Sequence, residues 1–155
     1  MLTVSPPTPP NPFRNIGATV AGLVAFVVVV FALEALVSSL FAHPDAVKLN
    51  PNDPAAMATL INSMPMEAKL IVVLGYFLGT LAGAYVAALF AASPRAWNPY
   101  VVGAFYAISS YMNFSQIPHP VWMVAASVAV GALGVWLGAR LGFARRALRL
   151  PPQSA

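Results

Sequence analysis

One acidic residue stands alone in the first long apolar stretch of the sequence. Glu34 lies within residues 31–37 (FALEALV), and no other charged residue occurs between Arg14 and Asp45. A carboxyl group inside a membrane span is costly and is by default a candidate for binding a proton or a ligand. Since Glu34 lies about seven residues before the end of the stretch, we expect it about 10 Å below the membrane surface.

Other polar side chains are expected in the same outer half of the membrane. They carry hydroxyl, phenol, amide or imidazole groups: Tyr76, Ser109, Ser110, Tyr111, Asn113, His119 and Ser127. We single out Ser110, Tyr111, His119 and Ser127 as the groups that could form an outward-facing polar site with Glu34. In the alternative interpretation, Glu34 is protonated or reached by water near the interface, or forms a hydrogen bond to a neighbouring helix, and the aromatic residues only anchor the helices there.

The sequence lacks the patterns that support catalysis or cofactor binding. It contains no cysteine, which excludes thiolate metal sites, disulfides and cysteine redox chemistry. The HExxH, GxSxG and phosphate-loop motifs are absent as well. His43 and His119 are each followed by proline, and nothing in the sequence brings them together as metal ligands. We therefore expect no cofactor, no metal site and no enzymatic activity.

Small residues recur at every fourth position in two apolar stretches. The first glycine ridge is Gly75, Gly79 and Gly83, continued by Ala87, and the second is Gly134, Gly138 and Gly142. Glycine costs about 1 kcal/mol per residue in a helix in water. In lipid it lets a neighbouring helix approach closely. We therefore predict close helix packing at both ridges, either within one chain or between two chains.

The elements that must position these residues are membrane helices. The chain of 155 residues is 59% hydrophobic and only 8% charged, whereas about a quarter of the residues in a soluble domain are charged. A helix needs about 20 mostly apolar residues to cross a bilayer, and the uncharged stretches provide four. We predict an all-α, up-down four-helix transmembrane bundle in residues 14–143, with spans over about 16–41, 67–92, 98–115 and 120–142.

The segments outside the spans have distinct compositions. Residues 1–13 are rich in proline and predict a disordered tail, and residues 144–155 form a basic tail. Between the first two spans, Asp53 followed by Pro54 predicts the start of a helix. Its apolar face consists of Met57, Leu60, Ile61 and Met64. This pattern predicts a short amphipathic helix in the membrane interface, with an ordered loop as the alternative.

The basic residues predict the orientation of the bundle. One side would carry Arg14, Arg95, Arg140, Arg145, Arg146 and Arg149, and the other would carry Lys48 and Lys69. By the positive-inside rule, both termini are cytoplasmic and the amphipathic helix is extracytoplasmic. The basic tail would also touch anionic lipid headgroups. The sequence pI near 9.9 therefore reflects membrane topology, and we expect no nucleic-acid partner.

Three segments resemble a family of small, four-span bacterial inner-membrane proteins of uncharacterised function. They are RNIGATVAGLVAF in the first span, LGTLAGAYVAALFAAS in the second and PHPVW before the fourth. The resemblance implies a multi-pass protein of the bacterial inner (plasma) membrane and no particular activity. We expect a non-enzymatic accessory or assembly component that packs through its glycine ridges, as a homo-oligomer or with a membrane-protein partner. The alternative is a small transporter or proton-coupled carrier that uses Glu34.

Overall fold

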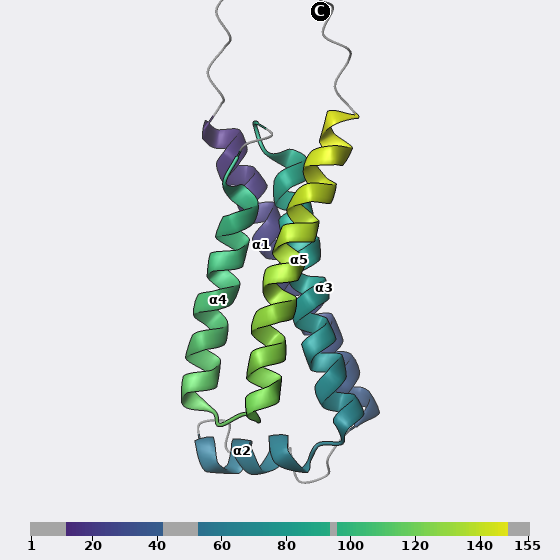
Figure 1. Cartoon of the computed structure of the whole chain (residues 1–155), viewed down its shortest axis with the longest axis vertical. Helices are drawn as coiled ribbons and strands as arrows, with labels where there is room; N and C mark the ends of the chain where they lie inside the picture. The colour runs from purple at the N-terminus through teal and green to yellow at the C-terminus, as the bar shows by residue number, and fades with distance from the viewer. Residues whose placement is uncertain (1–11, 42–52, 94–95, 149–155) are drawn as a thin grey trace, which may run out of the picture.

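The computed structural model describes residues 12–41, 53–93 and 96–148, which form five helices and no strand. The helices are α1 (Pro12–Leu40), α2 (Pro54–Ser63), α3 (Met66–Phe90), α4 (Asn98–Gln116) and α5 (Val121–Ala147). The prediction of an all-α fold is therefore confirmed. Four helices run side by side, and α2 lies across one end of them (Figure 1).

Helix α1 begins before its predicted span, and α5 ends after its predicted span. The proline-rich tail was expected to reach residue 13, but α1 already begins at Pro12, because proline is well tolerated in the first turn of a helix. The rest of that tail lies outside the described residues. At the other end α5 continues to Ala147, so that the first part of the predicted basic tail is helical.

Three helices in the described part of the chain are long and apolar enough to cross a membrane: α1, α3 and α5. These helices support an integral, multi-pass membrane protein with three candidate spans. Helix α4 has 19 residues but does not reach the same apolarity, because its second half is polar. The polar residues there are Ser109, Ser110, Asn113, Ser115 and Gln116. Helix length and hydropathy therefore support three membrane spans, and not the fourth that the sequence predicts.

Helix α3 lies between α1 and α5 and packs closely against both, whereas α4 makes fewer contacts with its neighbours. The glycine ridge of α3 faces α1. A Cβ atom on Gly83 would lie 2.8 Å from the carbonyl oxygen of Gly22, and one on Gly75 would lie 3.4 Å from the Cβ of Leu33. The later residue of α3, Gly83, thus lies against the earlier residue of α1, Gly22, and Gly75 lies against the later residue, Leu33. The two helices are therefore antiparallel.

The glycine ridge of α5 packs against another face of α3. A Cβ atom on Gly142 would lie 2.5 Å from the carbonyl oxygen of Tyr85 and 2.7 Å from the Cβ of Ala88. Gly138 lies against the backbone of Leu81 in the same way, and Gly134 against Thr80. The two ridges therefore do not meet each other. The ridge of α3 allows α1 to pack closely against α3, and the ridge of α5 allows α5 to pack closely against α3.

The short helix α2 is formed as the sequence predicted. The carboxylate of Asp53 accepts hydrogen bonds from the backbone N–H groups of Ala55 at 3.0 Å and Ala56 at 3.3 Å, which satisfies donors that a helix N-terminus leaves free. The Nζ of Lys69 donates to the carbonyl oxygen of Asn62 at 3.1 Å. This bond ties the end of α2 to the first turn of α3.

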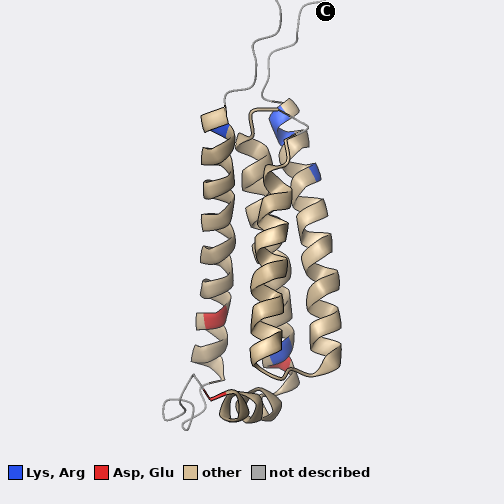
Figure 2. Ribbon diagram, turned by 90° about the vertical axis from the view of Figure 1, so that its left-hand side faces the viewer, with Lys and Arg blue, Asp and Glu red and all other residues tan. Residues whose placement is uncertain are grey.

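The described charges separate between the two ends of the bundle (Figure 2). Arginines gather where α1 begins and α5 ends, which we call the arginine end: Arg14, Arg140, Arg145 and Arg146. The described acidic residues lie toward the opposite end, the end that α2 covers (Figure 2), and Lys69, which bonds to Asn62 of α2, lies there as well. Of the predicted orientation markers, Lys48, Arg95 and Arg149 lie outside the described residues.

Candidate functional site

Glu34 lies in a groove between α1 and α4. The groove has a volume of about 230 Å³. Its polar lining residues are Glu34, Tyr76, Tyr106, Ser109, Ser110 and Asn113, and its apolar rim includes Phe31 and Phe105. The structure therefore brings Glu34 and Ser110 of the predicted site together. Within the described part of the chain, the carboxyl group of Glu34 forms no hydrogen bond and no ion pair.

The other three residues singled out from the sequence do not line this groove. Tyr111 is 74% exposed on another face of α4. The Nδ1 of His119 lies 2.6 Å from the carbonyl oxygen of Ile117, and its ring packs edge-on against Phe114. Ser127 is fully buried in α5. Tyr111 instead lines the groove between α4 and α5, His119 lies at the turn before α5 and Ser127 lies in the core, so that none of the three shares a site with Glu34.

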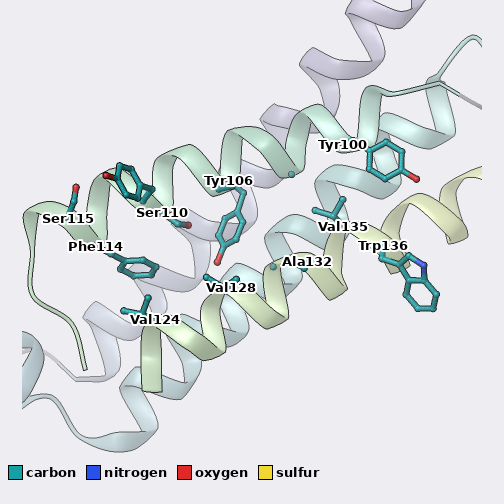
Figure 3. A pocket seen from close by; sticks show the side chains of 14 residues that line it. Tyr100, Tyr106, Ser110, Phe114, Ser115, Val124, Val128, Ala132, Val135 and Trp136 are labelled. Carbon is teal, nitrogen blue, oxygen red and sulfur yellow. The ribbon is translucent and has the colours of Figure 1, made fainter. Parts of the chain in front are cut away.

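A second groove, between α4 and α5, has a volume of about 700 Å³ and is mostly apolar. Figure 3 shows Tyr106 projecting from α4 toward α5 near the middle of this groove, with Phe114 and Val124 toward one end and Tyr100 and Trp136 toward the other. Tyr106 and Ser110 line both grooves. These two residues therefore separate the Glu34 groove from the groove between α4 and α5.

Tyr106 joins all four long helices. Its ring packs edge-on against Phe26 of α1 at 6.0 Å between ring centroids, and lies 5.8 Å from Tyr76 of α3. Its hydroxyl donates a hydrogen bond to the carbonyl oxygen of Ser127 in α5 at 2.8 Å. The ring also lies directly against Gly131, where a side chain would displace it. Sequence reasoning missed Tyr106; Gly131, which adjoins the second glycine ridge, was the only signal.

We expect Tyr106→Phe to lower the free energy of unfolding by about 1 kcal/mol, because it removes one buried hydrogen bond and preserves the ring packing. Denaturant titration of the purified protein in detergent measures this change. Tyr111→Phe is the matched control on the same helix, since Tyr111 is exposed, and it should have little effect. Equal losses in the two variants would contradict the role assigned to Tyr106.

A polar network at the arginine end was also missed from the sequence. The Nδ2 of Asn98, at the start of α4, donates to the carbonyl oxygen of Asn15 at 2.5 Å and to Oγ1 of Thr19 at 2.8 Å. The Oδ1 of Asn15 accepts a hydrogen bond from the backbone N–H of Ala92 at 2.8 Å. The start of α1 is thereby fixed to the end of α3 and to the start of α4.

The described residues include no group of three or more His, Cys, Asp or Glu side chains that could hold a metal ion. What the Glu34 groove can do chemically is bind or release a proton and form hydrogen bonds through hydroxyl and amide groups. Comparison with protein families, curated proteins and solved structures finds no match. The resemblance to small four-span bacterial proteins therefore rests on the sequence segments alone.

Proposed function

We propose that the chain is a non-enzymatic accessory or assembly protein of the bacterial inner membrane, with four spans and both termini in the cytoplasm. Helix α4 is the additional span. Its 19 residues extend about 28 Å at 1.5 Å per residue, close to the thickness of the hydrocarbon core, about 30 Å. The arginine end is the cytoplasmic end by the positive-inside rule, which places α2 on the outer surface.

The observation that supports an assembly role is an exposed set of polar side chains on α1 and α4. We call Glu34, Ser109 and Asn113 the polar flank. All three are exposed, and none forms a hydrogen bond or ion pair through its side chain within the described residues. Polar groups without partners are costly in hydrocarbon, and hydrogen bonds between helices satisfy them. The polar flank therefore favours a protein partner over lipid.

The partner we propose is a second copy of the chain. In a two-fold symmetric pair, each surface contacts the same surface on its partner. Glu34 and Asn113 line one groove and so lie at similar depth in the membrane. The Asn113 amide of each copy can then donate to the Glu34 carboxyl of the other. The ridge glycines pack inside the chain, so they support this assembly indirectly, by holding α1, α3 and α5 together.

Disulfide crosslinking in membranes tests this interface directly, because the chain contains no cysteine. Phe105 lies at the rim of the Glu34 groove, and Ile108 is exposed on α4 without lining either groove. We expect Phe105→Cys to form a covalent dimer on oxidation and Ile108→Cys to form much less. No dimer with Phe105→Cys, or equal dimer with both variants, would contradict the proposed face.

We expect Glu34→Leu to weaken dimerisation about a hundredfold, because the symmetric pair loses two hydrogen bonds, each worth about 1–2 kcal/mol in model membrane helices. Glu34→Gln keeps a side chain that can donate and accept, and should leave the dimer nearly unchanged. Energy transfer between labelled copies, measured while the protein is diluted with lipid, gives both dissociation constants. Equal affinities of Glu34→Leu and the wild type would contradict the role of the polar flank.

One observation favours a second candidate function, that of a proton-coupled carrier. Glu34 shares its groove with Tyr76, Ser110 and Asn113, and such groups can bind a proton or a polar ligand inside a membrane. The Glu34→Gln variant separates the two candidate functions. In reconstituted vesicles, Glu34→Gln should abolish a pH-dependent flux if Glu34 carries the proton. Wild-type vesicles without flux for a broad panel of cations and polar solutes would exclude this candidate.

A further inference from the structure

Two arginines from different helices meet at the end of α3. The Nε of Arg14 in α1 donates to the carbonyl oxygen of Phe90 at 3.2 Å. The Nη2 of Arg146 in α5 donates to the carbonyl oxygen of Ala92 at 2.7 Å. The carbonyl groups at the end of a helix carry partial negative charge, which draws both guanidinium groups to this point.

Each of these two bonds uses only one nitrogen atom of its guanidinium group. Arg146 is only 9% exposed, and its Nε and Nη1 are buried without a hydrogen-bond partner. The described carboxylates lie away from the arginine end (Figure 2), so that none of them neutralises the pair. A buried charge without a partner is strongly unfavourable. This arrangement calls for an acceptor that is itself negatively charged.

We propose that Arg14 and Arg146 bind a phosphate group between α1, α3 and α5. The planar guanidinium group pairs with phosphate oxygens in a bidentate geometry. Arg14 is exposed and can meet the phosphate from outside, while Arg146, whose Nε and Nη1 are buried, supplies a second positive charge behind it. Helix ends lie near the lipid headgroups, and basic pockets between membrane helices bind anionic headgroups. An anionic phospholipid and inorganic phosphate share this chemistry, and the test separates them.

Thermal unfolding of the full chain in detergent provides the test. Phosphatidylglycerol, phosphatidylcholine and inorganic phosphate are added separately at constant ionic strength. A ligand that binds only the folded protein raises its Tm. We expect phosphatidylglycerol to raise the Tm by at least about 3 °C and phosphatidylcholine to have no effect. A rise with inorganic phosphate as well would show that the free ion also fits the site.

The control variant is Arg145→Gln. Arg145 is exposed and immediately precedes Arg146, so that Arg145→Gln and Arg146→Gln change the net charge equally. Arg146→Gln should abolish the Tm shift, and Arg145→Gln should retain it. If Arg146→Gln does not fold, Arg14→Gln takes its place, because Arg14 is exposed. An unchanged shift in these variants, an equal loss with Arg145→Gln, or no shift in the wild type would overturn the proposal.

Discussion

Gly83→Leu is expected to lower the free energy of unfolding by more than about 3 kcal/mol. A Cβ atom at this position would lie 2.8 Å from the carbonyl oxygen of Gly22 and 2.9 Å from both the Cβ of Phe26 and Cγ1 of Val102. Overpacking in a tight core costs about 1–3 kcal/mol, and more where neighbours cannot move. Here one neighbour is backbone, so that α1 would have to shift away from α3.

The matched control is Gly17→Leu on α1. A Cβ atom on Gly17 would meet nothing within 4 Å, so that a side chain there has free space. Chemical denaturation in mixed micelles, followed by circular dichroism, measures both variants. We expect Gly17→Leu to match or slightly exceed the wild type in stability, because leucine is the better helix former. A similar loss in the two variants would show that the α1–α3 contact is not the cause.

Asn98→Ala is expected to lower the free energy of unfolding by about 2–3 kcal/mol. Asn98 is fully buried, and its amide forms the two hydrogen bonds that join the start of α4 to Asn15 and Thr19 of α1. Each such bond contributes about 1 kcal/mol, and the lost side-chain volume adds the cost of a cavity. Because α4 makes fewer contacts with its neighbours than the other long helices do, its first turns should also open.

Hydrogen exchange of the α4 amides measures that opening, and denaturant titration measures the stability. Gln116→Ala, at the other end of α4, is the control, since Gln116 is exposed and its replacement should cost less than about 0.5 kcal/mol. Exchange of the α4 amides in the Asn98→Ala variant at the wild-type rate would show that the hydrogen bonds from Asn98 do not fix α4 to α1.

The glycine spacing in the sequence indicates which face of a helix packs closely but not which helix it meets. Residues four apart share one helix face, which is why Gly75, Gly79 and Gly83 form a ridge. Their partner depends on how the chain folds back, and the structure places α1 there. The same limit applies to Gly138, whose neighbour is the backbone of Leu81.

The expected depth of a residue in the membrane does not predict which polar residues share the Glu34 groove. Residues expected at one depth can still point in different directions, because successive helix positions differ by about 100°. Ser110 reaches the Glu34 groove, whereas Tyr111, the next residue, does not. Asn98 and Arg146 were missed for another reason. Their partners, Asn15 and Ala92, are 83 and 54 residues away in the sequence, and no local pattern links them.

The short connection between α4 and α5 also bears on how the chain enters the membrane during synthesis. The polar second half of α4 makes its insertion as a single helix unfavourable. Only residues 117–120 separate it from α5, which is apolar enough to insert. In the proposed four-span arrangement, we therefore expect α4 and α5 to leave the translocon together as a helical hairpin. The hairpin would then dock onto α1 and α3, with α4 held in lipid by its attachment to α5.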